Sequence, residues 1–163
     1  MSEKQIRVLL VDDEEELIEY LSKRLLREGF TVRAVTSGPR ALETVDVEEF
    51  DVAVVDLKMP GMDGIEVQRK LKQKRPFLQT VVLTGHGSLQ TALESGRQDA
   101  FRFLQKPADH GELVQALRDA AAEKERQIME RFREEMQEIA SSGASPRDIV
   151  VRVDALRRKF GLS

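Results

Sequence analysis

Apolar and polar positions follow one another in a regular order through the first two thirds of the chain. Five short apolar runs, each typical of a buried strand, are separated by stretches in which apolar residues recur at helical spacing. This order predicts an α/β domain with a doubly wound, five-stranded parallel sheet. The expected strands are residues 6–11, 31–35, 51–55, 80–83 and 100–104.

The segments between these strands carry the helical pattern. Leu17, Leu21 and Leu25 lie four residues apart, and Gly29 follows as a helix stop signal. Residues 59–64, after the third strand, combine Pro and Gly in the order of a tight turn. The expected helices of the sheet are residues 14–28, 39–45, 65–74, a segment near 89–95 and a segment that starts near Asp109.

The last of these helical patterns does not end where the sheet would be covered. Its apolar stripe continues to about Ala140, so we expect this helix to extend beyond the domain. Leu117, Ile128 and Ile139 are spaced by 11 residues, a period that fits a nearly straight pair of helices. Ala121 and Phe132 have the same spacing, and these five positions are too few to identify a coiled coil.

A break at residues 141–144 separates this helix from another one. Ser145, Pro146 and Asp148 combine an N-cap residue, a first-turn proline and an acidic residue at the third position, which together predict a helix start. We therefore expect a domain over residues 1–122 and a C-terminal helical extension over residues 123–163.

Composition narrows the classes of protein. A length of 163 residues supports one domain with an appended element, and the absence of Cys excludes disulfides and thiolate metal sites, which fits a reducing cytoplasm. No apolar stretch approaches the ~18 residues of a membrane span, so we expect a soluble, unprocessed protein without membrane contact. A net charge of −3 with mixed signs gives no reason to expect nucleic-acid binding, and we interpret the basic cluster 157–159 as a solvated helix end.

Four of the expected strands end at polar residues that suit phosphoryl chemistry. Asp12 and Asp13 follow the first strand, Asp56 the third, Thr84 the fourth and Lys106 the fifth. Because the carboxyl ends of parallel strands meet at one edge of a sheet, these side chains should converge in one pocket. Three carboxylates, a hydroxyl and an ammonium can together hold a divalent hard cation and a phosphoryl group.

Each of these residues also has a structural interpretation. The acidic pair 12–13 could cap the following helix, Asp56 and Thr84 could lead into turns, and Lys106 could be a surface or ion-pairing lysine. Three acids on neighbouring strands repel one another, however, and a bound cation would relieve that repulsion. In the functional interpretation, the pair 12–13 holds Mg²⁺, directly or through water, and Asp56 binds it and attacks phosphorus to form an acyl phosphate.

The residues around these positions carry a family resemblance. Asp12-Asp13 and the segments 54–64, 83–87 and 103–107 resemble the receiver domain of two-component response regulators, over roughly residues 5–122. The resemblance implies a flavodoxin-like fold with strand order 2-1-3-4-5. It also implies that Asp56 accepts a phosphoryl group from a sensor histidine kinase or a phosphotransfer protein.

The same resemblance implies further roles. The acidic pair 12–13 matches the family's metal site, and Lys58 would offer its backbone carbonyl to Mg²⁺. Thr84, Lys106 and Phe103 match the switch set, in which the aromatic ring rotates between an outward and an inward position, although Phe103 could also be an ordinary strand aromatic. Residues 95–102 depart from the family pattern, which leaves the shape of the fourth-helix surface open.

The leading hypothesis is therefore a phosphorylation switch that acts on a downstream protein effector and catalyses only its own phosphorylation and dephosphorylation. A Mg²⁺-dependent phosphohydrolase with an Asp nucleophile is one alternative, but such enzymes generally need a second acid where this chain has Lys58. The other alternative is a helical dimerisation scaffold with a receiver-like fold, in which residues 123–163 form a homodimer. Neither a dinucleotide fingerprint nor a P-loop is present in the sequence.

Overall fold

A computed structural model of the chain describes residues 4–59, 61, 63–85 and 100–162. The chain divides into two compact units, Met1–Lys124 and Glu125–Ser163. The helix expected near 89–95 and the departures from the family pattern at 95–99 lie outside the described residues.

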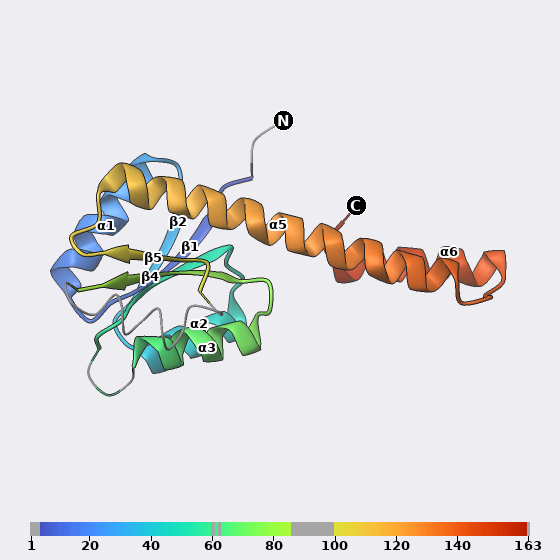
Figure 1. Cartoon of the computed structure of the whole chain (residues 1–163), viewed down its shortest axis with the longest axis horizontal. Helices are drawn as coiled ribbons and strands as arrows, with labels where there is room; N and C mark the ends of the chain where they lie inside the picture. Colours follow the sequence, from blue (N-terminus) through green and yellow to red (C-terminus); the bar gives the residue numbers. More distant parts are fainter. Residues whose placement is uncertain (1–3, 60, 62, 86–99, 163) are drawn as a thin grey trace. The chain divides into compact units, whose positions relative to one another are not determined.

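A five-stranded parallel sheet forms the centre of the first unit (Figure 1). Its strand order is β2-β1-β3-β4-β5, which confirms the expected fold class. β1 lies between β2 and β3, with Leu10 paired to Ala34 on one side and to Val54 on the other. The strands are β1 (Arg7–Val11), β2 (Thr31–Val35), β3 (Val52–Asp56), β4 (Gln79–Thr84) and β5 (Arg102–Gln105).

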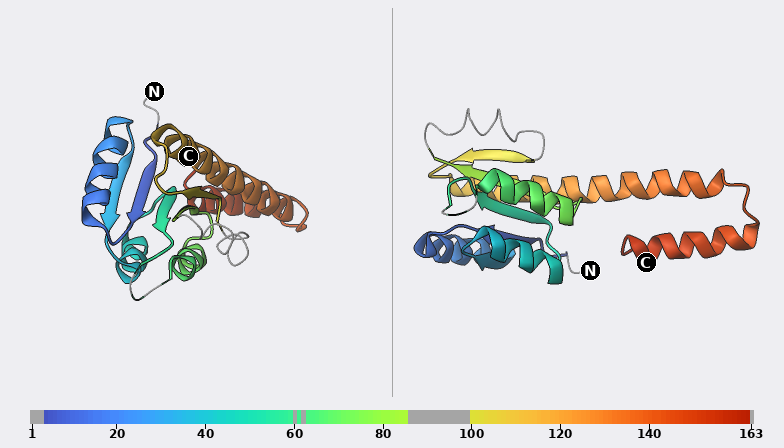
Figure 2. Two further views of the ribbon diagram at one scale, coloured as in Figure 1. Left: turned by 60° about the vertical axis from the view of Figure 1, so that its left-hand side comes forward. Right: turned by 90° about the horizontal axis from the view of Figure 1, so that it is seen from below.

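Helices cover both faces of this sheet (Figures 1 and 2). Their ends lie within two residues of the expected ends, because the capping and stop signals are local features of the sequence. None of the described helices is long and apolar enough to cross a membrane. The helices are α1 (Glu15–Arg27), α2 (Gly38–Val47), α3 (Gly64–Lys74), α5 (His110–Ala140) and α6 (Pro146–Lys159).

Strand side chains alternate between two apolar layers. On β1, Val8 and Leu10 belong to the layer that includes side chains of α1 and α5, whereas Leu9 and Val11 belong to the layer with α2 and α3. Every residue of β3 is buried. A strand that is covered on both faces reads as a continuous apolar run, and this is why β1 and β3 were readable from the sequence.

Helix α3 begins directly behind the end of β3. A Cβ atom at Gly64 would lie only 2.7 Å from the Leu57 Cα and would overlap the Asp56 carbonyl oxygen. The Gly64 N–H donates to the Leu57 carbonyl at 3.0 Å, and Asp63 Oδ1 caps the helix by accepting from the Ile65 N–H at 2.9 Å. Only glycine permits this close approach, which fixes the backbone at the carboxyl end of β3.

At the opposite end of β3, Asp51 anchors α5. The Lys124 Nζ lies 3.1 Å from Asp51 Oδ1 and donates to the Phe50 carbonyl at 3.0 Å. Asp51 Oδ2 accepts from the Arg7 backbone N–H at 2.8 Å. The Asp51 and Lys124 side chains are each less than a fifth exposed, so this ion pair is protected from solvent screening.

The second unit is a helical hairpin. α6 runs antiparallel to the C-terminal part of α5 (Figure 2), and the rings of Phe132 and Phe160 meet edge to face with 6.1 Å between their centroids. The Ser145 Oγ accepts a hydrogen bond from the Asp148 N–H, and Pro146 occupies the first turn. The expected start of this helix is therefore confirmed.

Replacing Gly64 by Ala should lower the free energy of unfolding by about 2 kcal/mol or more, because the new methyl group overlaps backbone atoms that cannot move easily. An ordinary Gly→Ala change in a helix acts in the opposite direction. Gly85→Ala is the control, since a Cβ there would have no heavy atom of the described residues within 4 Å, and its effect should stay below about 0.5 kcal/mol. Denaturant unfolding measures both, and equal stabilities of the two variants would contradict the packing described at Gly64.

Candidate functional site

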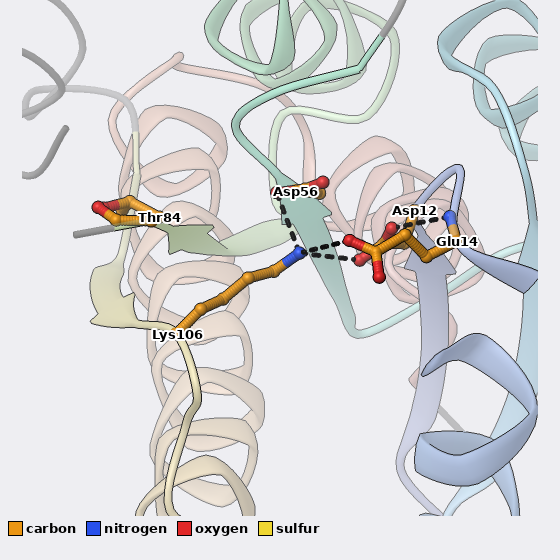
Figure 3. A network of polar contacts seen from close by, with 6 residues as sticks. Asp12, Glu14, Asp56, Thr84 and Lys106 are labelled. Atoms are coloured by element: carbon orange, nitrogen blue, oxygen red, sulfur yellow. Dashed lines mark hydrogen bonds and ion pairs between the residues drawn. The ribbon is translucent and has the colours of Figure 1, made fainter. Parts of the chain in front are cut away.

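Asp12 and Asp56 lie side by side at the carboxyl edge of the sheet (Figure 3). Asp12 directly follows β1, Asp56 is the last residue of β3, and these two strands are neighbours in the sheet. The Asp12 residue is 1% exposed and Asp56 is 5% exposed. Two carboxylates are thus held close together with little access to water, which is unfavourable unless cations compensate them.

Lys106 supplies one such cation. Its Nζ lies 3.1 Å from Asp12 Oδ2 and 3.2 Å from Asp56 Oδ1, between the two carboxylates (Figure 3). The Lys106 N–H donates to the Thr84 carbonyl at 2.7 Å, which holds the lysine backbone against β4. The Lys106–Pro107 peptide bond is cis. The sequence-based prediction that these three side chains converge agrees with this geometry.

Asp13 completes a group of three acids that could hold a metal ion. One carboxylate oxygen from each of Asp12, Asp13 and Asp56 lies within 4.8 Å of the others, and Asp13 is exposed. Oxygens on opposite sides of Mg²⁺ lie about 4.2 Å apart, twice the usual Mg–O distance. The three acids therefore fit this ion after a small movement, or with water between the ion and one carboxylate.

The electrostatics of the pocket leave negative charge uncompensated. Burial raises the pKa of Asp56 above its ordinary value, the nearby Asp12 carboxylate raises it further, and Lys106 offsets only part of this effect. Burial alone would lower the pKa of Lys106, but the Asp12 and Asp56 carboxylates outweigh it and raise that pKa. A divalent cation would supply the missing positive charge.

The ion pairs of the Lys106 ammonium in the described part of the chain do not include Thr84, Phe103 or Lys58. The Thr84 side chain is fully buried, and its hydroxyl donates to the Gly85 carbonyl at 3.1 Å, pointing away from Lys106 (Figure 3). Phe103 is half-buried on β5. Lys58 is exposed, and a hydrogen bond from its backbone to the Asp56 carboxylate lowers the pKa of that group.

Sequence reasoning missed two contributors to the pocket. The Glu14 N–H donates to Asp12 Oδ1 at 2.9 Å, and the Glu14 carboxylate lies 3.9 Å from the Lys106 Nζ. From the sequence, residue 14 is only the first residue of the expected helix 14–28. Gly64 supports the backbone of Asp56 and belongs to the turn signal at residues 59–64. Its close contact with the backbone of Asp56 and Leu57 depends on how α3 packs, so the sequence did not reveal it.

Comparison with known sequences identifies the family. The family described as "Response regulator receiver domain" matches residues 8–118. The chain belongs to this family. The receiver is 37% identical over 134 residues to the transcriptional regulatory protein GlrR of Escherichia coli (strain K12), covering 82% of this chain and 30% of GlrR. It is 35% identical over 107 residues to the DNA-binding transcriptional regulator NtrC of the same strain, covering 66% of this chain and 23% of NtrC.

Solved structures agree with this assignment. An adenylate cyclase from Rhodopirellula baltica is 34% identical, with a TM-score of 0.74, over 78% of this chain and 96% of that chain. A CheY-like receiver domain protein from Methanospirillum hungatei is 27% identical, with a TM-score of 0.71, over 76% and 99%. The response regulator TrrA of Thermotoga maritima, solved in complex with Mg²⁺ and BeF, is 25% identical, with a TM-score of 0.65, over 71% and 99%.

The raised pKa of Asp56 predicts a dependence of stability on pH. The folded state holds the Asp56 proton more tightly than the unfolded state, so this group favours folding most below its ordinary pKa of 3.8 and progressively less as the pH rises through its raised value. Asp56→Asn should therefore increase the free energy of unfolding at pH 7 by roughly 1 kcal/mol without Mg²⁺, and the gain should vanish at low pH. Denaturant titrations at several pH values measure it, and a gain that is constant with pH would contradict the prediction.

Removing the lysine should have the opposite effect. Lys106→Ala leaves two buried carboxylates without a cation and should lower the free energy of unfolding by about 3 kcal/mol at pH 7. Mg²⁺ should restore more stability to this variant than to the wild-type protein, because the ion replaces the missing charge. Lys23→Ala breaks an exposed ion pair with Glu19 and serves as control, with an expected loss below about 1 kcal/mol and the same Mg²⁺ response as the wild-type protein. An Mg²⁺ response that is equal in all three proteins would argue against the shared charge balance.

Proposed function

We propose that this receiver accepts a phosphoryl group on Asp56 in a Mg²⁺-dependent reaction. The observation that carries the proposal is the buried pair Asp12 and Asp56, bridged by Lys106 and left with excess negative charge. Of the two carboxylates in the bridge, only Asp56 lies on the central strand β3. Asp12 and Asp13 are then the metal ligands, together with Asp56 and the backbone carbonyl of Lys58.

The reaction is an in-line transfer. A carboxylate oxygen of Asp56 attacks phosphorus and forms the acyl phosphate while the bond between phosphorus and the donor breaks. When the donor is the phosphohistidine of a sensor kinase, a P–N bond breaks and the leaving imidazole keeps the electron pair and takes up a proton. Mg²⁺, when bound, shields the negative charge of the phosphoryl oxygens from the surrounding carboxylates.

Lys106 then exchanges partners. Its ammonium is already within 3.2 Å of Asp56, so it can pair with a phosphoryl oxygen through a small movement. The Thr84 hydroxyl, now on the Gly85 carbonyl, would turn to another phosphoryl oxygen. Phe103 pairs with Val82 in the sheet register, two residues before Thr84, so a shift at the end of β4 could be followed by rotation of the Phe103 ring.

The biological setting follows from the same chemistry. We propose that the donor is a sensor histidine kinase or phosphotransfer protein in the cytoplasm. Residues 1–122 would form the receiver. Residues 123–163 would form an extension that contacts a downstream protein effector or a second copy. The receiver would catalyse only its own phosphorylation and dephosphorylation. The chain spans 30% of GlrR and 23% of NtrC, so we do not assign the activity of those whole regulators to this chain.

The two alternatives from the sequence gain less support. Lys58 is exposed and stands where an Asp-nucleophile phosphohydrolase generally has its second acid. A dimerisation scaffold would not need a lysine that bridges two buried carboxylates. Such a cluster is unfavourable for stability, so its presence indicates a role other than stabilising the fold.

Intact-mass measurement after incubation with acetyl phosphate and Mg²⁺ tests the proposal. The wild-type protein should gain one phosphoryl group, Asp56→Asn should gain none, and chelation of Mg²⁺ should reduce the gain at least about tenfold. Asp51→Asn is a matched control, because Asp51 is also largely buried at an end of β3 and also pairs with a lysine at 3.1 Å. Phosphoryl gain in Asp56→Asn, or equal loss in both variants, would refute the assignment of Asp56.

A further inference from the structure

The contact between α5 and α6 forms a small apolar seam in the second unit. Leu156 is the one buried apolar side chain among residues 125–162, and Val150 and Val151 are each 61% exposed. The other apolar side chains of the seam are half-buried. They are Ile128, Phe132, Met136 and Ile139 on α5, and Ile149, Val153 and Phe160 on α6.

A seam of this size is marginal for stability. The second unit, Glu125–Ser163, is below the ~40 residues at which domains without disulfides or metals usually need oligomerisation. The chain has no Cys, so a disulfide cannot hold the hairpin closed. The closed hairpin is therefore expected to open often enough to exchange partners.

α6 does not depend on α5 for its helical caps. The Ser145 Oγ accepts from the Asp148 N–H, and Pro146 starts the first turn. The link at residues 141–144 includes Gly143, whose φ of +73° suits glycine, and the Ser142 hydroxyl donates to the Ile139 carbonyl at the end of α5. The two helices are thus separately terminated segments on a short hinge.

Glu135 determines which helix can cover α5. Its side chain is 15% exposed, and its Oε1 lies 2.7 Å from the Lys159 Nζ. Its Oε2 is buried and has no hydrogen-bond partner among the residues that the structure describes. Suppose that two α5 helices paired in parallel through the apolar stripe that α5 contributes to the seam. The two Glu135 carboxylates would then face each other across the two-fold axis. Like charges in a partly buried position are strongly unfavourable. The stripe therefore requires an apolar helix that carries a cation opposite Glu135.

α6 is a helix of this kind. Its residues 146–159 hold five basic and two acidic side chains, whereas residues 125–140 of α5 hold three basic and five acidic ones. Lys159 stands next to Phe160, so the cation and the aromatic ring that meet Glu135 and Phe132 come from the same turn. The same contacts can form with α6 of another copy.

We propose that two copies of this chain exchange α6, so that α6 of each copy packs on α5 of the other. The contacts within the seam are the same in the closed hairpin and in the exchanged dimer, and protein concentration and the hinge conformation then decide between them. This deepens the proposed contact with a second copy and does not rest on phosphoryl transfer to Asp56. Failure of either experiment therefore leaves the other conclusion unaffected.

Charge-reversed full-length variants test the exchange. Glu135→Lys and Lys159→Glu each place like charges in the seam, both within one chain and between identical copies. When the two variants are mixed without Mg²⁺ or phosphodonor, exchange of α6 restores opposite charges at both seams of a heterodimer. Native mass spectrometry, with one variant isotope-labelled, should show the heterodimer about fivefold above either homodimer.

Two controls define the outcome. Arg126 and Glu130 form an exposed ion pair within α5, so a mixture of Arg126→Glu and Glu130→Arg should show no enrichment of the heterodimer. A chain that carries both Glu135→Lys and Lys159→Glu should recover the wild-type hydrogen exchange of α6, which shows that the reversed charges are compatible with folding. Heterodimer abundance equal to that of the control mixture, or homodimers of each single variant at wild-type abundance, would overturn the proposal.

Discussion

The site depends on one ammonium group shared by two buried carboxylates. Lys106 lies 94 residues from Asp12 in sequence, yet its Nζ is 3.1 Å from one carboxylate and 3.2 Å from the other. One positive charge cannot balance two buried negative charges. Burial first, and then the neighbouring Asp12 carboxylate, raise the pKa of Asp56 above its ordinary value. The fold maintains this imbalance by covering β1 and β3 on both faces, and the result is a pocket that favours an incoming divalent cation.

The two ends of β3 show how such a pocket differs from a structural ion pair. Asp51 has its own lysine, Lys124, and a backbone N–H donor from Arg7, so its charge is fully compensated. Asp56 must share Lys106 with Asp12, and its backbone is held in place by the contact with Gly64. Both carboxylates are largely buried and both are paired with a lysine. The number of acids per cation, rather than burial or pairing, therefore distinguishes the end of the strand that carries the candidate site.

Much of the fold was predictable because its signals are local. The buried strands read as continuous apolar runs, and Gly29 and Ser145 mark helix ends through backbone geometry and capping that involve only near neighbours. The site residues were predictable because parallel strands bring their carboxyl ends together. The sharing of Lys106 and the pair between Lys124 and Asp51 were not, since both depend on the packing of elements more than 70 residues apart.

The hairpin shows a different limit of sequence reasoning. The spacing of Leu117, Ile128 and Ile139 fits a nearly straight pair of helices but is too short to identify a coiled coil, and periodicity identifies a face and not its partner. Charge provides the missing information, because Glu135 within the stripe disfavours a second α5 and favours a helix with a lysine at the matching position. That helix lies in the same chain, on a hinge that contains Gly143. α6 makes the same contacts whether it packs on α5 of its own chain or on α5 of a second copy. The apolar stripe of α5 therefore need not be exposed in either state.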